Sequence, residues 1–481
     1  MSSPPRRFPD RAPRSGAARL LAASVVVSVL PSCISQDAGY GDVKQVVRER
    51  TGLDVRWRAM DGEGGKSADE TRALLAQPLT EESAVRLALL NNRDLQAAFE
   101  ELGVARARLV SAVALPNPEL EGRIGFARGS RPDLMISVTE SVSDLLWLPM
   151  RDGAARAELD AAKLTVAGRV LDFVYAVKVA FHEREAAERI ALLTATTHEA
   201  AEASYEAAAR LHEAGNIPDL DFMNQQALRE ETTTAAEEAR LDQDRAAGRL
   251  ALLLAVPLPG PVAIADVQGQ SALPAKEVDV TRLDGRALAR SLDVEIARRK
   301  SYAASRRASL ARATGLLPDL RAGFEAERIE SLPWALGPVA GLRFPLFYQG
   351  QGEVSLAEAE MRRGNETRAA LLARVGVEAK LAGERLLAAR TRVIRYEKDI
   401  LPLRRHIVEE TLLRYNAMSV GVFQLLQAKR DQLDAELRYA RAVRDYFVVR
   451  SEVELFLAGR LPMSRADVTM QAPASGAPSH D

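Results

Sequence analysis

The sequence predicts a mainly helical protein that also carries a small set of membrane-type β-strands. Residues 152–211 contain two glycines and no proline, and residues 352–415 contain a single proline, Pro402, so both read as very long helices. Four shorter segments alternate polar and apolar residues with the period of two that strands require. An internal repeat places each kind of segment in the chain twice.

The repeat has an offset of about 200 residues, which is far longer than a single supersecondary unit. Leu115-Pro116 recurs as Leu317-Pro318, and residues 252–259 recur as residues 455–462. Each copy reads as a helix, two strands and a long helical hairpin. We expect five segments: a lipoprotein signal peptide (1–32), a lipid-anchored leader with little core (33–79), a first repeat with its linker (80–283), a second repeat (284–462) and a flexible C-terminal tail (463–481).

Cys33, the only cysteine, stands at the end of an export segment in which five arginines precede an apolar run from Leu20 to Leu30. This run has about 11 residues, roughly half of what a membrane-spanning helix needs, and predicts a cleaved signal. A cysteine directly after Ser32 resembles a bacterial lipobox, whose thiol carries a diacylglycerol. Ile34 follows, which resembles lipoproteins sent to the outer membrane. The alternative is a cysteine buried in the core.

The composition excludes several classes of function. Residues 1–32 hold five arginines and one aspartate, so the rest of the chain has a net charge of −5 and no basic field for nucleic acid. One cysteine and five scattered histidines show no metal-ligand spacing, and we expect neither a metal site nor a cofactor. The stretch from Gly64 to Ser67 lacks the earlier glycine of a phosphate loop. No nucleophile has a catalytic context, so we expect no enzyme.

The helical segments are too long for a compact domain. One helix is expected from Thr80 to about Ala114, ended by Pro116. At 1.5 Å per residue, the two long helices would measure about 90–100 Å, and Pro402 should bend the second one. After it, a coiled-coil-like seam recurs every seven residues, with one residue widening the stripe: Leu426, Leu433, Ala440 and Phe447, with Leu437.

The four alternating segments are Glu119–Arg128, Asp133–Ser141, Asp319–Arg328 and Leu336–Leu346. Their length of about ten residues and their dyad pattern match the strands of membrane barrels. One face is apolar and includes Ile124 and Phe324. The other face is expected to line a water-filled lumen and carries Glu119, Glu121, Arg123, Arg321, Glu325, Glu327 and Arg343.

Four strands cannot close a barrel, because known membrane barrels have eight strands or more. Open strand edges in lipid would leave unsatisfied backbone groups, so several chains must share one barrel. The sequence therefore predicts an oligomer. The alternative for any single strand is an ordinary sheet covered on one face by helices, and the alternative for the whole chain is a lipid-anchored, coiled-coil structural protein of the periplasm without a pore.

Two further segments, at the expected ends of the hairpins, are residues 211–220 (LHEAGNIPDL) and 414–423 (RYNAMSVGVF). Together with the tandem repeat and the Leu-Pro pairs before the first and third strands, they resemble the TolC-type outer-membrane efflux channels over residues 80–462. The lipidated N-terminus suits the subfamily that includes the heavy-metal and multidrug channels.

The resemblance implies a homotrimer in the outer membrane, with a 12-strand barrel on a helical tunnel that extends into the periplasm. It implies passive export of drugs or heavy-metal ions, with a periplasmic adaptor and an inner-membrane pump of the resistance-nodulation-division type as partners. Lipid is the other partner. The hairpin tips are expected to touch the adaptor through Gly215, Asn216, Ile217, Pro218, Asp219, Ser419, Val420, Gly421 and Val422, with Gly215 and Gly421 giving the turns their backbone freedom.

The periplasmic gate departs from the family pattern. The best-known members carry two aspartates, six and nine residues after the glycine-like position of the second tip. Counted from Gly215 and Met418, the corresponding positions in this chain hold Asp221, Asn224, Gln424 and Gln427. Because glutamine keeps hydrogen bonding without charge, we expect a gate closed by hydrogen bonds and packing, with Asp221 as the only nearby carboxylate. The alternative is that both glutamines simply pack in the helix seam.

Overall fold

The computed structural model describes residues 37–58, 65–126, 131–255, 264, 272–329 and 332–462. The predicted signal peptide, Cys33 and the predicted C-terminal tail (463–481) lie outside these ranges.

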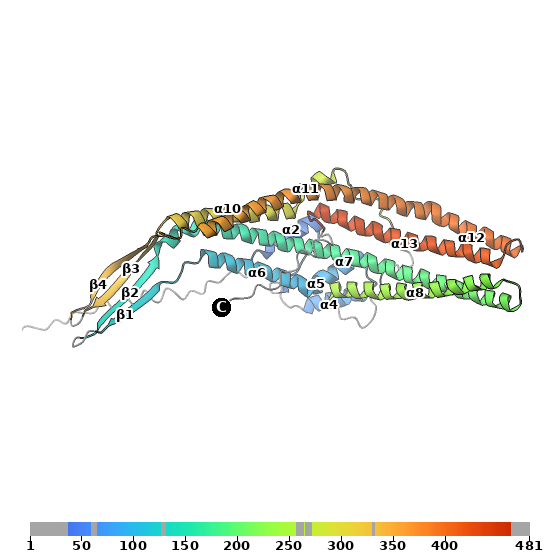
Figure 1. Cartoon of the computed structure of the whole chain (residues 1–481), viewed down its shortest axis with the longest axis horizontal. Helices are drawn as coiled ribbons and strands as arrows, with labels where there is room; N and C mark the ends of the chain where they lie inside the picture. Colours follow the sequence, from blue (N-terminus) through green and yellow to red (C-terminus); the bar gives the residue numbers. More distant parts are fainter. Residues whose placement is uncertain are drawn as a thin grey trace, which may run out of the picture. The chain divides into compact units, whose positions relative to one another are not determined.

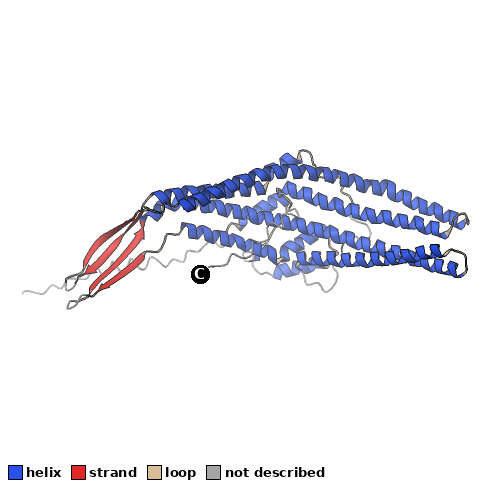
Figure 2. Cartoon of the chain, in the orientation of Figure 1, coloured by secondary structure: helices blue, strands red, loops and turns tan. Residues whose placement is uncertain are grey.

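The elements follow the chain in an order that repeats once. Figure 1 labels them, and Figure 2 shows that the four strands form one sheet. The first copy follows two leader helices, and its predicted plan of helix, two strands and long hairpin is confirmed in both copies. The elements are α2 (Tyr40–Thr51), α4 (Gly65–Leu75), α5 (Glu81–Asn91), α6 (Arg93–Val113), β1 (Glu119–Gly125), β2 (Asp133–Ser141), α7 (Val142–Glu213), α8 (Asp219–Leu254), α9 (Leu283–Arg290), α10 (Leu292–Leu316), β3 (Asp319–Arg328), β4 (Ala335–Arg343), α11 (Gln351–Arg395), the π-helical η2 (Tyr396–Ile400), α12 (Leu401–Asn416) and α13 (Val422–Ala458).

The single helix expected from Thr80 to Ala114 is wrong, because the chain breaks at Asn92 into α5 and α6. Asn92 has an extended backbone, and its side chain accepts a hydrogen bond from the Leu95 amide at 2.9 Å. Ser291 makes the same break between α9 and α10 and accepts from the Val294 amide at 3.3 Å. A short polar residue therefore ends one helix and caps the next in both repeats.

The long helices exceed the predicted limits. α7 has 72 residues, which corresponds to about 110 Å at the usual rise. It begins at Val142 rather than Asp152 and includes Pro149 near its start. α8 lies along α7 as the second arm of the hairpin (Figure 1).

In the second repeat, α11, η2 and α12 continue without a break from Gln351 to Asn416. The wider turns of η2 directly precede Pro402, the second residue of α12. Proline cannot donate the helical hydrogen bond, and its ring clashes with the carbonyl four residues earlier. A local π-helical segment therefore accommodates Pro402, and the bend expected at this proline stays a prediction.

Two of the four strands, β1 and β4, are shorter than the segments expected from the sequence. β1 has 7 residues and ends at Gly125, and β4 ends at Arg343, so Phe344 and Leu346 follow the strand. β2 and β3 have the predicted bounds.

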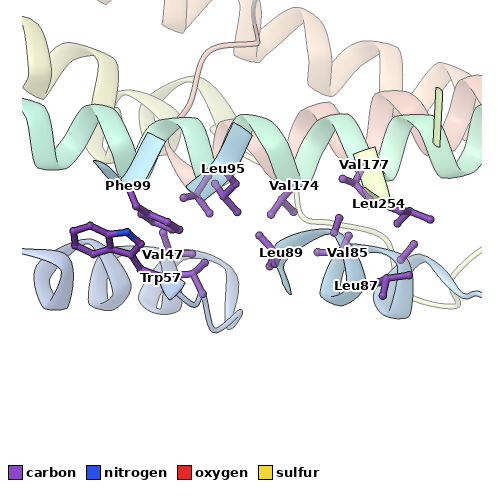
Figure 3. Close-up of a cluster of buried hydrophobic side chains, with 14 of the residues drawn as sticks. Val47, Trp57, Val85, Leu87, Leu89, Leu95, Phe99, Val174, Val177 and Leu254 are labelled. Carbon is purple, nitrogen blue, oxygen red and sulfur yellow. The ribbon is translucent and has the colours of Figure 1, made fainter. Parts of the chain in front are cut away.

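The leader has a real core, so the expectation that it contributes little is wrong. Figure 3 shows Val47 and Trp57 of the leader packed near Phe99 of α6. Trp57 is 3% exposed, and Val47 and Phe99 are fully buried. The Tyr40 hydroxyl donates to the Val55 carbonyl at 2.7 Å, which closes the leader on itself. The leader is therefore part of the folded helical body.

The second core lies between α9, α11 and α13. The predicted seam of α13 contributes to the buried interior, with Leu433, Ala440 and Phe447 all buried.

Arg460, just after α13, joins the two repeats. Its guanidinium pairs with Asp172 of α7, with one nitrogen–oxygen distance of 3.0 Å, and also with Asp293 of α10. Asp293 in turn accepts from the Leu461 amide at 2.9 Å. Arg50 of the leader donates to the Ala458 carbonyl at 2.9 Å, so the leader caps the end of α13.

None of the helices in the described ranges is both long enough and apolar enough to cross a membrane.

Candidate channel-forming site

The sheet has the order β1-β2-β3-β4, and all neighbouring pairs are antiparallel. Within the described part of the chain, β1 and β4 are edge strands that each pair on one side only. Residues directly opposite each other in an antiparallel pair project from the same face. The register therefore assigns every strand residue to one of two faces.

The seven residues predicted to line a lumen all share one face. The register places Glu121 opposite Ser137, and Ser137 opposite Glu325. The same register places the other five on this face: Glu119 lies opposite Thr139, Arg123 and Glu327 both lie opposite Met135, Arg321 lies opposite Gly341, and Arg343 lies opposite Asp319. Arg321 also pairs with Glu119, which belongs to a different repeat. We call this surface the polar face.

The opposite surface, the apolar face, is broadly exposed in the single chain. Leu120, Phe324 and Leu336 are 73%, 67% and 78% exposed. The register places Leu120 opposite Val138, and Val138 opposite Phe324, so these side chains form one continuous patch. Soluble monomers rarely expose a patch of this kind, which indicates that lipid or protein covers it.

The two hairpin tips turn in the same way. In the first tip, the Asn216 amide donates to the Leu211 carbonyl at 2.8 Å, and Gly215 has a positive φ of 71°. In the second tip, the Ser419 amide donates to the Arg414 carbonyl at 2.9 Å. Both are Schellman-type helix ends. The nine tip residues predicted to touch an adaptor therefore lie in or beside equivalent turns.

The expected role of Gly421 is wrong. Its φ is −79°, which any residue can adopt, and it is the N-cap of α13. Met418 takes the left-handed conformation instead, with φ 55°. Because Met418 corresponds to Gly215, the register between the tips is settled, and Gly421 corresponds to Pro218, the N-cap of α8.

The predicted gate positions lie in the first turns after the tips. Asp221, Asn224, Gln424 and Gln427 are all exposed. Gln427 donates to Asp431 at 2.8 Å, and the other oxygen of Asp431 accepts from Arg404 at 2.9 Å. The expectation that Asp221 is the only nearby carboxylate is therefore wrong, although Arg404 balances the charge of Asp431.

A buried ionic cluster lies among α5, α7 and α13, and sequence reasoning missed it. His182 of α7 is 2% exposed, and its two ring nitrogens lie 3.0 Å from Glu81 and 3.2 Å from Glu185. Lys178 pairs with Glu81 at 2.8 Å and with Glu454 of α13 at 2.7 Å. The only feature of the local sequence that could have indicated this cluster is the i, i+3 spacing of His182 and Glu185, which places both side chains on one helix face.

The cluster shifts the pKa values of its members. Burial alone would lower the pKa of His182, but hydrogen bonds to Glu185 and Glu81 outweigh it and raise that pKa. Burial would raise the pKa of Glu81, but hydrogen bonds from His182 and the charge of Lys178 lower it to about 2. The cluster is thus a set of paired charges that holds the three helices together. Among the described residues, no three His, Cys, Asp or Glu side chains are grouped to hold a metal ion.

Comparisons with known proteins agree with this architecture. No protein-family model matches the chain. The cobalt-zinc-cadmium resistance protein CzcC of Cupriavidus metallidurans is 23% identical over 394 residues, which cover 79% of this chain and 90% of CzcC. The crystal structure of CusC, described for its transmembrane channel formation, aligns with a TM-score of 0.62 at 17% identity, over 82% of this chain and 92% of CusC. The outer membrane channel CmeC of Campylobacter jejuni aligns with a TM-score of 0.64 at 15% identity, over 89% and 94% of the two chains.

The chain has the fold of the TolC-type outer-membrane efflux channels. The TolC-type fold explains the duplicated order of elements, the single sheet contributed by both repeats, and the paired hairpins. The sequence resemblance to this fold is therefore confirmed.

Proposed function

We propose that this protein is the outer-membrane channel component of a tripartite efflux system, a passive conduit that exports drugs or metal ions. One observation carries the proposal: an open four-stranded sheet with one polar face, one exposed apolar face and two edges that no other described residue pairs with. Such a sheet satisfies its edges and covers its apolar face when copies of the chain close a barrel in lipid. Conduction needs no catalytic residue.

Strand number favours a trimer. Two copies would supply eight strands, and the interior of an eight-stranded barrel is filled by side chains. Three copies would supply twelve strands and leave a lumen lined by Glu121, Glu325 and the other residues of the polar face. This is the homotrimer that the TolC-type resemblance implies.

We further propose that the tips dock onto a periplasmic adaptor, which links the channel to an inner-membrane pump of the resistance-nodulation-division type. The tips expose apolar surface, with Met418 94% and Leu220 65% exposed. Photocrosslinkers at Asn216 and Ser419 should capture an adaptor in cells. If only a crosslinker at Leu332, in the loop between β3 and β4, captured an adaptor, the sheet end rather than the hairpin tips would face the adaptor.

Lipidation of Cys33 would add a second anchor beside the barrel. Cys33→Ser should abolish uptake of labelled fatty acid while leaving the strands able to insert. The alternative function, a lipid-anchored structural protein without a pore, would need the anchor and the helices. It would have no use for a sheet with one polar and one apolar face, which is why we favour the channel.

Cross-linking between strand edges tests the assembly. Glu121 of β1 and Gly341 of β4 lie on the polar face, each two residues from the helical end of its strand. In a Cys33→Ser background, Glu121→Cys with Gly341→Cys should give covalent dimers and trimers with a thiol cross-linker, and Glu121→Cys alone should give none. Absence of any intermolecular product with the double variant would contradict the shared barrel.

A further inference from the structure

A groove runs along the side of α6, α7, α10 and α11. These helices pack in that order, as the neighbouring pairs α6–α7, α7–α10 and α10–α11 show (Figure 1). One cavity of about 690 Å³ is lined by residues of all four helices. Since one cavity contacts four consecutive helices, these helices present the lining residues toward a common space, and we call that side of the row its concave side.

The floor of the groove is apolar and shallow. It is made by alanines, of which Ala161, Ala303 and Ala304 are 2%, 2% and 5% exposed. Their small side chains leave the space that forms the cavity. The volume falls within the range of about 300–1,000 Å³ that is typical of sites for small organic molecules.

Each carboxylate of the rim has an ion-pair partner, but Glu158 and Glu360 share one. Glu158 pairs with Arg307, and Glu360 lies 3.5 Å from the same guanidinium. Glu101, the third carboxylate of the lining, pairs with Arg169.

Three cations of the rim are left without such partners. Arg108 of α6, Lys300 of α10 and Arg363 of α11 line the groove, and none of them forms an ion pair with any residue that the structure describes. They come from three different helices that face one cavity. The lining holds one more cation than carboxylates, so the groove combines an apolar floor with a rim of net positive charge.

We propose that this concave groove binds organic anions that have an apolar body, such as aromatic sulfonates or carboxylates. The apolar body would cover the alanines, and the anionic group would meet Lys300, Arg363 or Arg108. The inference deepens the proposed conduit and rests on it for its physiological meaning: the concave side of the helix row would face the passage, which would favour organic anions over metal cations.

Calorimetric titration of the purified full-length channel in neutral lipid nanodiscs at low salt tests the proposal. The probe is 2-naphthalenesulfonate, and its cationic counterpart is 2-naphthylmethylammonium. We expect about one sulfonate site per chain, an affinity at least tenfold lower for the ammonium, and weaker sulfonate binding as salt is added. Equal affinity for both probes would overturn the proposal.

Matched substitutions locate the site. Lys300→Gln and Arg363→Gln should each weaken sulfonate binding about two- to fivefold, as expected for one exposed charge pair, and the double variant about tenfold. Arg298→Gln on α10 and Arg362→Gln on α11 remove the same charge outside the groove lining and should change nothing. Thr367→Trp should block the groove without altering charge. Unchanged binding in both the double variant and Thr367→Trp would place the probe elsewhere.

Single-channel recording separates this inference from the proposed function. A channel that conducts but binds no sulfonate would contradict the groove site alone. A protein that binds sulfonate through Lys300 and Arg363 but never conducts would contradict the conduit and leave the site standing.

Discussion

Met418 adopts the same left-handed backbone conformation as Gly215, with φ values of 55° and 71° at equivalent places of the two hairpin tips. Both residues donate to the carbonyl three residues earlier at 2.9 Å. The two tips are thus built on one turn, although only one of them has the residue that the turn prefers. A side chain in this conformation costs about 1 kcal/mol.

The turn geometry makes a prediction about stability. Gly215→Ala should lower the free energy of unfolding by about 1 kcal/mol, since it places a Cβ at positive φ. Met418→Gly should be neutral or stabilising, because it removes the same strain. Gly421→Ala is the control and should be mild, since its φ is −79° and a Cβ there would meet nothing within 4 Å. Loss of stability in Gly421→Ala equal to that in Gly215→Ala would refute the assignment.

The two faces of the sheet should differ in their tolerance of charge. Ile124→Arg and Phe324→Arg place a cation on the apolar face and should cost about 2–4 kcal/mol near the bilayer midplane. The control must be an arginine on the polar face. Ser137→Arg does not serve, because Ser137 is 5% exposed between Glu121 and Glu325 and has no room for a larger side chain.

Adjacent residues of β2 give a sharper comparison. Ile136→Arg changes the apolar face, while Met135→Arg changes the polar face, where Glu327 lies opposite on one side and Arg123 on the other. We expect Ile136→Arg to reduce insertion into lipid vesicles and resistance to urea, and Met135→Arg to have little effect. Equal tolerance at the two positions would rule out the membrane assignment of the sheet.

The buried cluster around His182 predicts a pH dependence. The raised pKa of His182 stabilises the fold fully below the ordinary value of 6.5, and this contribution is lost as the pH rises through the folded-state pKa. Glu81, with its pKa lowered to about 2, contributes above 4.5 and loses its contribution as the pH falls toward 2. Both contributions are therefore present between pH 4.5 and 6.5.

Chemical unfolding of the wild type and of His182→Gln, measured from pH 4.5 to pH 9, tests this pH dependence. The stability difference between them should be largest between pH 4.5 and 6.5 and smaller at pH 9. His406→Gln, at an exposed histidine on α12, should show no such trend. A difference that stays constant from pH 5 to pH 9 would mean that His182 is not protonated in the fold.

The gate region predicts weak block by multivalent cations. Gln424 and Gln427 carry no charge, and the charge of nearby Asp431 is balanced by Arg404. Gln424→Asp with Gln427→Asp should create stacked carboxylates in the proposed trimer and strengthen block by a trivalent cation. Arg404→Gln should also strengthen block, by freeing Asp431. Strong block of the unmodified channel that none of these changes affects would contradict this view of the gate.

Much of the fold could be predicted because its signals are local and occur twice. The length of α7 follows from a stretch poor in glycine and proline, and the two faces of β3 follow from strict alternation. The break at Asn92 was missed because asparagine is tolerated inside helices, and only the packed structure decides between a cap and a helical position. The pairing of Glu81 with His182 joins residues 101 positions apart, and no local pattern predicts it.

The candidate site shows the same division. Membership of the polar face could be predicted residue by residue, since the period of two holds along each strand. The backbone conformations of Gly421 and Met418 could not be predicted from the sequence. Glycine suits a left-handed position but does not require one, and in the second tip a methionine occupies the left-handed position. Asp431 was missed because the gate positions were counted only as far as Gln427, and Asp431, which accepts a hydrogen bond from Gln427, lies one helical turn further along α13.

Conductance of the purified full-length protein across a planar lipid bilayer tests the central claim most directly. The claim is that copies of this chain close a barrel whose lumen is lined by the polar face. It predicts discrete conductance steps, and Glu325→Cys should make the open steps sensitive to a charged, membrane-impermeant thiol reagent in the Cys33→Ser background. Protein that forms cross-linked trimers in the membrane but gives no conductance, in the wild type or with both tips removed, would contradict the conduit.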